Sequence, residues 1–176
     1  MDISSENTSF NYLRGSPDFL NKVLNSISSA VLLLDKDMRL QAFNDSLRTM
    51  FSSAPEEYLL YQKCGNAIGC ANPIEQQQEC GEADQCCNCE LRKAAILTYC
   101  EGVEFYKNRL QREFLRRDGT KVRKYLQFST RRVRFNQDPY VLLIIEDLTD
   151  LILKEDLIRE QQHLIEQLRQ EDAGNP

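Results

Sequence analysis

Seven cysteines carry the strongest chemical signal in the sequence, because all of them lie between Cys64 and Cys100. The run Cys86-Cys87-Asn88-Cys89 places three thiols within four positions. Two thiolates in a Cys-x-x-Cys turn face the same way and can bind one metal centre. The most economical ligand set has nine, five and two intervening residues and consists of Cys70, Cys80, Cys86 and Cys89.

The other three cysteines fit this centre less well. Adjacent side chains generally point apart, so Cys87 is an alternative ligand only where Cys86 is not one. Cys64 is an alternative to Cys70. Cys100 lies eleven residues after Cys89, roughly 16 Å away along a helix that rises 1.5 Å per residue. Cys100 therefore cannot share a single site with Cys89.

The donor set restricts the identity of the metal. Four thiolates without a histidine suit a [4Fe–4S] cluster or a structural Zn²⁺ ion. Zinc sites more often contain two Cys-x-x-Cys turns, and this chain contains one. The irregular spacing therefore favours the iron–sulfur cluster. Zinc, a disulfide and free thiols are the alternatives.

Composition and charge exclude several classes of protein. Apolar residues make up 41% of the 176 residues, and no run approaches the ~20 apolar residues of a membrane span. The first fifteen residues lack the apolar stretch of a secretory signal, so we expect a cytoplasmic protein, where clustered cysteines more often bind metal than form disulfides. A net charge of −5 disfavours nucleic acid as the main partner. We interpret the ten Lys and Arg residues between Arg109 and Arg134 as a solvated sheet face with acidic neighbours.

Hydrophobic periodicity predicts the elements that precede and surround the cysteines. Residues 1–16 are rich in Ser and Asn and are expected to be flexible, and an amphipathic helix follows from Pro17 to near Ser28. Ala30–Asp35 and Arg39–Asn44 are short runs typical of a β-hairpin. From Ser52 to Gln85 the pattern breaks down into loops, which is unusual at this length unless something holds the loops together.

Regular patterns return after Cys86. A helical stripe ends at Gly102, a residue typical of a helix C-terminus. Three strands are then predicted at residues 109–117, 121–135 and 140–146, with an Asp-Gly turn at Asp118-Gly119 between the first two.

The C-terminal segment has a different period. Leu151, Ile158 and Ile165 are seven residues apart, and two to three such heptads predict a coiled coil. The alternative is a single helix that packs on its own domain.

This order of elements resembles the PAS sensory domain family. Its matching segments are the hairpin Ala30–Asp35 and Arg39–Asn44, the turn Arg117-Asp118-Gly119-Thr120, and Asp147-Leu148-Thr149-Asp150 at the end of the last strand. The match covers about residues 19–150. The resemblance implies an α+β fold with a five-stranded antiparallel sheet and helices on one face. It places a PAS-like sensory domain at residues 17–149, a Cys-rich insertion at 64–100, and a C-terminal signalling or coiled-coil helix at 150–176.

The family resemblance also implies a function. The chain would be a sensory or regulatory module of a bacterial signal-transduction protein, not an enzyme. Asp147, Thr149 and Asp150 would transmit the signal to the C-terminal helix. Implied partners are a second copy, bound through the N-terminal and C-terminal helices, and a linked or separate effector such as a kinase, cyclase, phosphatase or transcription regulator. No membrane association is expected.

The cysteine pattern carries a second resemblance. Gly69-Cys70, Cys80-Gly81 and Cys86-x-x-Cys89 are similar to a bacterial PAS subgroup with a four-cysteine insertion at this place. The resemblance implies that the chain senses redox state or a gas through its metal centre. Oxygen or nitric oxide would destroy a [4Fe–4S] cluster and release the loop between Cys70 and Cys89, because metal binding free energy is folding free energy for such a loop. The alternative is a cofactor-free or zinc-stapled PAS module for dimerisation or protein interaction.

Other cofactors and catalytic chemistry find little support in the sequence. The only histidine, His163, lies in the predicted exit helix, which disfavours histidine-ligated haem and a Cys–His nucleophile pair. Lys63-Cys64-Gly65-Asn66 does not match the reactive-cysteine segment of photoactive flavin domains. The seven glycines form no phosphate-binding loop. We therefore expect no enzymatic activity.

Overall fold

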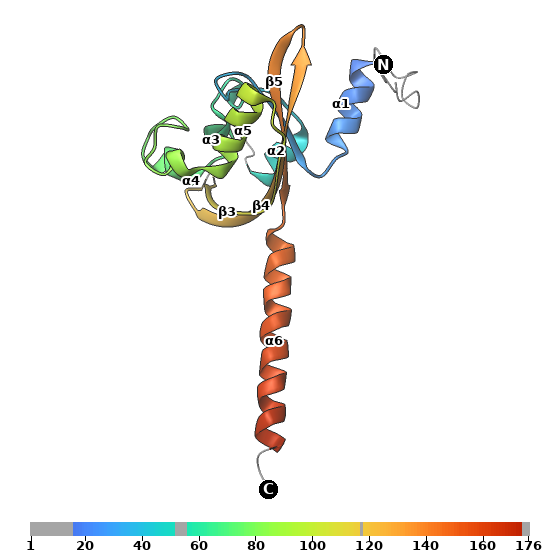
Figure 1. Ribbon diagram of the computed structural model, residues 1–176, viewed down its shortest axis with the longest axis vertical. Coiled ribbons are helices and arrows are strands. Elements are labelled where there is room, and N and C mark those ends of the chain that lie inside the picture. Colours follow the sequence, from blue (N-terminus) through green and yellow to red (C-terminus); the bar gives the residue numbers. More distant parts are fainter. Residues whose placement is uncertain (1–15, 52–55, 117, 174–176) are drawn as a thin grey trace.

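A computed structural model describes residues 16–51, 56–116 and 118–173. These residues form one five-stranded sheet with α3, α4 and α5 over one face, α1 on the other side, and α6 extending away from the sheet (Figure 1). The predicted flexible segment 1–16 lies outside the described residues except for Ser16. The predicted α+β fold, antiparallel sheet and C-terminal helix are confirmed.

The sheet is antiparallel throughout, with strand order β2-β1-β5-β4-β3. Its strands are β1 (Ala30–Leu34), β2 (Leu40–Phe43), β3 (Phe105–Leu115), β4 (Lys121–Phe135) and β5 (Asp138–Asp147). The β4–β5 hairpin closes through Asn136 and Gln137, whose φ angles of 50° and 72° are left-handed, as a tight two-residue hairpin turn requires.

The core lies between the sheet and the helices. Alternate residues of each strand point inward. The fully buried ones include Leu32, Leu126, Leu143 and Ile145. Leu32 pairs with Leu143 across β1 and β5. The central strands thus bury an apolar row that holds the sheet without help from the cysteines.

Helix α5 (Glu90–Glu101) packs on this inner face and ends at Gly102, whose φ of 75° is left-handed, as predicted. A buried hydrogen bond of 2.6 Å joins the Thr98 and Thr130 hydroxyls, and the Thr98 hydroxyl also donates to the Val103 carbonyl at 2.7 Å. Two buried hydroxyls are therefore paired, and they connect α5 to β4.

The stretch predicted to consist of loops contains several short helices. They are η2 (Glu56–Tyr58), α3 (Cys64–Ala67) and α4 (Ala71–Glu75), and η3 (Cys86–Asn88) follows directly after the stretch. The loop prediction was therefore wrong for η2, α3 and α4, because helices of three to five residues are too short to produce a periodic pattern. Ala67, Ile68 and Ala71 are buried, so this segment adds to the core.

Two helices on the N-terminal side frame the first hairpin. Helix α1 (Pro17–Asn25) ends three residues before the predicted Ser28 and buries none of its residues. Helix α2 (Asp45–Met50) follows Asn44. The Asn44 amide donates to the carbonyls of Leu24 at 2.8 Å and Ser29 at 3.0 Å. Asn44 therefore ties the chain after α1 to the hairpin.

Helix α6 (Thr149–Ala173) projects beyond the sheet (Figure 1). Its heptad residues Leu151, Ile158 and Ile165 are 50–54% exposed. Among the described helices, none has the length and apolar character needed to cross a membrane.

Candidate metal centre

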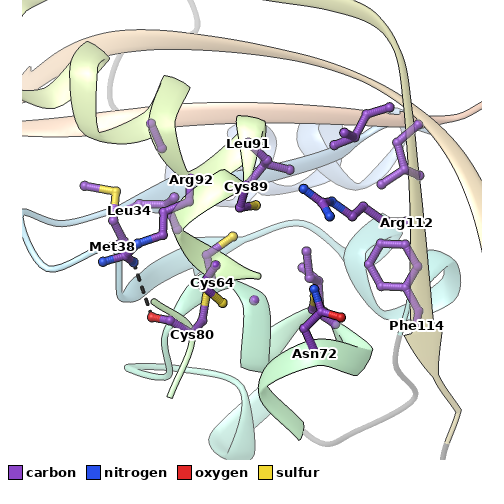
Figure 2. A pocket seen from close by; sticks show the side chains of 17 residues that line it. Leu34, Met38, Cys64, Asn72, Cys80, Cys89, Leu91, Arg92, Arg112 and Phe114 are labelled. Carbon is purple, nitrogen blue, oxygen red and sulfur yellow. Dashed lines mark hydrogen bonds between the residues drawn. The ribbon is translucent and has the colours of Figure 1, made fainter. Parts of the chain in front are cut away.

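Five cysteines from four separate parts of the chain line one cavity under α5. They are the four predicted ligands and the alternative ligand Cys64, that is Cys64, Cys70, Cys80, Cys86 and Cys89. Figure 2 shows the side chains of Cys64, Cys80 and Cys89 gathered near one another. The volume of this cysteine cavity is about 40 Å³, far below the roughly 300–1,000 Å³ of pockets that enclose drug-sized ligands.

Backbone hydrogen bonds place Cys64 at the first residue of α3 and Cys70 directly before α4. The Cys64 amide donates to the Met38 carbonyl at 2.9 Å, and the Cys70 amide donates to the Gly65 carbonyl at 2.8 Å. Cys70 also pairs with Phe114 as an isolated bridge to the edge strand β3. The sheet and the first hairpin therefore fix both cysteines.

Cys80 is held by the side chains of two other elements. Its amide donates to the Asn66 side-chain oxygen at 2.7 Å, and its carbonyl accepts from the Arg92 guanidinium at 3.3 Å, the dashed bond in Figure 2. A Cβ atom at Gly65 would lie 2.5 Å from the Cys80 sulfur, and one at Gly81 would lie 2.5 Å from the Arg92 guanidinium carbon. Both glycines are therefore needed for this close approach.

Cys86 and Cys89 form the turn that leads into α5. Cys86 is buried in η3, and the Cys89 amide donates to the Cys86 carbonyl at 3.2 Å. Cys89 is the residue before the first turn of α5. The Cys-x-x-Cys turn thus connects the cavity directly to the helix that packs on the sheet.

The electrostatic environment keeps three of these thiols protonated. Burial raises the pKa of Cys64 well above its usual value, and the neighbouring cysteines raise it further. Burial also raises the pKa of Cys70 to about 11 and raises that of Cys80. The positive charge of Arg92 opposes the shift at Cys64 and Cys80, and Arg112 opposes it at Cys70. Without a metal, Cys64, Cys70 and Cys80 are therefore neutral thiols beside two cations.

Two cysteines lie outside the cavity. Cys87 is exposed, and its thiol donates to the Asp84 carbonyl at 3.3 Å. Cys100 is exposed near the C-terminal end of α5. Of the two alternative ligands, the cavity contains Cys64 and not Cys87.

The residues present fit a thiophilic metal centre. The donors are thiols alone, the preferred ligands of iron–sulfur clusters and of many structural zinc sites. In the conformation of the described residues, no three Cys, His, Asp or Glu side chains converge closely enough to hold a metal ion. The thiol side chains would therefore have to rotate inward to bind a metal.

Two arginines of the cavity wall were missed by the sequence analysis. Arg112 lies on β3 between the buried residues Leu110 and Phe114, and in Figure 2 it extends toward Cys89. An arginine at an inward position of an alternating strand is a signal that the sequence carried. Arg92 carried no comparable signal, because it follows the buried Leu91 on a helix.

The predicted output residues lie at the junction of β5 and α6. Asp147 accepts hydrogen bonds from the Thr149 amide at 3.0 Å and from the Thr149 hydroxyl at 2.5 Å, and its carboxylate pairs with Lys124 at 2.5 Å. The Tyr125 amide donates to the Thr149 hydroxyl at 3.0 Å. Asp150 is exposed in the first turn of α6. Asp147 and Thr149 thus connect β4 to α6.

The charge on Asp147 is stabilised by these contacts. Burial opposes ionisation, but the Lys124 ammonium and the two Thr149 donors outweigh it and lower the pKa of Asp147. The start of α6 therefore contains an ionised carboxylate at neutral pH.

Acidic side chains pair with the basic strands as predicted. Lys121 contacts Glu75 at 2.7 Å, Arg123 contacts Glu113 at 3.4 Å, and Arg131 contacts Glu104 at 3.5 Å. His163 is exposed on α6, away from the cysteine cavity.

Comparison with known proteins identifies the fold. No protein-family model matches the sequence, and no curated protein matches it. The structure is similar to the PAS domain of nitrogen regulation protein NR(II) from Vibrio parahaemolyticus, with 14% identity, 73% of this chain and 96% of that chain covered, and a TM-score of 0.50. It is also similar to the PAS domain of BvgS from Bordetella pertussis, with 14% identity, 85% and 96% covered, and a TM-score of 0.51.

A third similar structure is an RNA-binding light-oxygen-voltage receptor, with 14% identity and a TM-score of 0.54. The match covers 96% of this chain and 42% of that chain. At such low identity these similarities establish the fold alone: the chain has a PAS fold. Membership of the four-cysteine subgroup stays a prediction.

Proposed function

We propose that this chain is the sensory module of a signal-transduction protein and that its cysteine cavity holds a thiolate-ligated metal centre, in the first place a [4Fe–4S] cluster. The observation that carries the proposal is that Cys64, Cys70, Cys80, Cys86 and Cys89 all line one cavity. The PAS fold supports a sensory role, since the similar structures include PAS domains of a nitrogen regulation protein and of BvgS.

Charge balance supports a metal centre over unoccupied thiols. Four thiolates exceed the charge of a Zn²⁺ ion or a [4Fe–4S]²⁺ core by two, and Arg92 and Arg112 supply two positive charges at the cavity wall. The described residues that line the cavity include no Asp or Glu, so two arginines beside neutral thiols would have no anionic partner there. Because loading releases thiol protons, metal affinity rises with pH.

The spacing of the ligands favours the cluster, with zinc as the second candidate. Only one Cys-x-x-Cys turn is present, whereas zinc sites more often use two. A cluster needs more space than a single ion, so the 64–89 loops would move apart on loading while the thiol side chains turn toward the cluster.

The chain's own residues provide a route from the cavity to α6. Cys89 precedes α5, and Thr98 on α5 is hydrogen-bonded to Thr130 on β4. Further along β4, the Tyr125 amide donates to Thr149 at the start of α6. When bound, a [4Fe–4S] cluster supplies a redox couple and a target for oxygen or nitric oxide. Loss of the centre would loosen the start of α5, and this change would reach α6 through β4.

The output requires a second copy and an effector. The exposed apolar residues of α1 and the heptad residues of α6 form a homodimer in this proposal, with α6 as a coiled coil. A linked or separate kinase, cyclase, phosphatase or transcription regulator receives the signal. The module itself acts in the cytoplasm and catalyses no reaction.

Anaerobic purification followed by iron, sulfide and zinc analysis tests the proposal. We expect about four iron and four sulfide per chain and absorption near ~400 nm. Zinc at about one per chain with no sulfide would identify the site as a structural zinc site instead.

Serine variants test whether the cavity cysteines hold the metal. Cys86→Ser and Cys89→Ser should lose most of it. Cys87→Ser is the matched control, because it removes the exposed thiol between them and should keep the full content. Retention of metal by both cavity variants, or its absence from the wild-type chain, would refute the proposal.

A further inference from the structure

A second hollow adjoins the cysteine cavity at the edge of the sheet. Its volume is about 180 Å³, which is room for several water molecules at the roughly 10–15 Å³ that each needs. Residues from β3, from the start of α4 and from the loop before η3 line this recess: Cys70, Asn72, Gln85, Gln111, Arg112 and Glu113. We call it the edge recess.

The edge recess and the cysteine cavity share a wall. Cys70, Asn72 and Arg112 line both of them. A molecule in the edge recess would therefore lie beside Cys70, on the outer side of the predicted metal ligands.

Arg112 contains a hydrogen-bond donor that the protein leaves without an acceptor. Within the described part of the chain, its Nε is the buried side-chain atom that has no hydrogen-bond partner. An unsatisfied buried donor destabilises the folded protein, and more so when it belongs to a charged group. Native proteins rarely retain such a group unless a ligand, an ion or water satisfies it.

The other lining residues suit an anion. Asn72, Gln85 and Gln111 have amide groups that can donate hydrogen bonds. The carboxylate of Glu113 would repel an anion, but it is paired with Arg123 at 3.4 Å and with Lys121 at 3.6 Å. The charge that remains uncompensated at the recess is the Arg112 guanidinium.

We propose that the edge recess binds a small oxyanion, held by the guanidinium of Arg112 and by the neighbouring amides. A guanidinium is a planar fork of N–H donors that matches the oxygens of nitrate, phosphate or a carboxylate. Its five N–H groups allow it to face the recess and the cysteine cavity at once. This inference goes beyond the proposed sensor function, because the anion site exists whether or not the cysteines hold a metal.

Calorimetric titration of the full 176-residue chain tests the proposal, at constant ionic strength, with sodium nitrate, sodium phosphate and sodium succinate. We expect saturable binding of at least one of these anions. Binding of nitrate or phosphate would assign an inorganic ligand, and binding of succinate would assign the carboxylate of a metabolite. The titration is repeated on chelator-treated protein, which should bind the anion at least as tightly, because chelation removes the net negative charge of the metal centre beside Arg112.

Variants assign the binding to Arg112. Arg112→Gln should lower the affinity for the anion about ten- to a hundredfold, because it removes hydrogen bonds from a charged group. Arg112→Lys keeps the charge and the fold but loses the fork, and should weaken binding by less. Glu113→Gln should strengthen binding, because it removes the only carboxylate among the lining residues.

Arg109→Gln is the matched control, because it removes an exposed arginine of the same strand that stacks on Tyr125 and does not line the recess. It should bind the anion as the wild-type chain does. Absence of saturable binding for all three anions, or equal binding by wild type, Arg112→Gln and Arg112→Lys, would overturn the proposal. If the wild-type chain holds no metal but still binds the anion, the proposed sensor function is refuted and the anion site is not.

Discussion

The sheet and the cysteine segment, residues 64–89, are buried by different means. In the sheet, inward residues such as Leu32 and Leu143 pack in continuous apolar rows across paired strands. In the cysteine segment, short helices are held by separate hydrogen bonds, such as that from the Cys64 amide to the Met38 carbonyl. Their buried side chains combine apolar residues such as Ala67 and Ile68 with the thiols around a small cavity.

This difference implies a division of roles. Continuous apolar burial makes a strand cooperative and stable, so the sheet serves as the scaffold. A segment held by a few hydrogen bonds and by ligand contacts opens at low free energy, as a switch requires. We expect perturbations of the sheet to unfold the whole chain, and perturbations of the cysteine segment to act locally.

Leu32→Ala should have the largest effect on stability. It removes a side chain with no exposed surface from the centre of the sheet, and such truncations lower the free energy of unfolding by about 2–5 kcal/mol. Urea denaturation of wild type and variant measures this change. Leu97→Ala on the half-exposed side of α5 is the control and should change stability by far less. Equal losses for both variants would contradict the scaffold role of the sheet.

Gly65→Ala should disturb the cysteine segment and leave the sheet folded. The new Cβ would lie 2.5 Å from the Cys80 sulfur, and such overpacking lowers stability by about 1–3 kcal/mol. Metal content and hydrogen exchange measure the result, which should be loss of metal and faster exchange in residues 64–89. Gly119→Ala adds the same methyl where nothing lies within 4 Å, and it should leave the segment unchanged.

Thr98→Val tests the connection between the two regions. It leaves the buried Thr130 hydroxyl without the Thr98 partner that lies 2.6 Å away, which should lower stability by about 1–3 kcal/mol. Thermal unfolding measures the loss. The double variant Thr98→Val/Thr130→Val removes both partners and should recover part of it. If the double variant loses the sum of both single effects, the hydroxyl pair is not the connection.

Asp147→Asn should have the smallest effect, on the order of 1 kcal/mol for a partly exposed contact, and it should depend on pH. The lowered pKa of Asp147 means that its contribution is present above the unfolded-state pKa of about 3.9. That contribution disappears as pH falls through the folded-state pKa.

The difference in melting temperature between wild type and Asp147→Asn should therefore be constant near pH 7, decrease as pH falls below the unfolded-state pKa, and vanish once pH lies below the lowered folded-state pKa. Asp150→Asn is the control, since Asp150 is exposed on the adjacent turn. A difference that persists in acid would show that the charge of Asp147 does not stabilise the start of α6.

The sheet was predictable because its strands show either alternation, as in residues 121–135, or a continuous apolar run, as in Ala30–Leu34. The predicted strand 121–135 coincides with β4 (Lys121–Phe135). β3 begins at Phe105, four residues before the predicted Arg109, because a register shift between Lys107 and Leu110 interrupts the alternation.

The candidate site was predictable only in its residue types. Spacing identified Cys70, Cys80, Cys86 and Cys89 as a set, but it left Cys64 and Cys87 as possible substitutes. Their positions depend on contacts between distant segments, such as the bridge of Cys70 to Phe114. The spacing of residues along the sequence does not show which distant segments are in contact. The cavity could therefore be identified only from the structure.

Hydrogen exchange of the metal-loaded and chelated chain tests the central claim most directly. The account predicts that chelation removes protection from residues 64–89 and from the start of α5, while the amides of β1, β4 and β5 keep theirs. Asp147→Asn and Cys87→Ser should not change this contrast. Equal protection of residues 64–89 with and without metal would contradict the claim that the cysteines and their ligand order this segment.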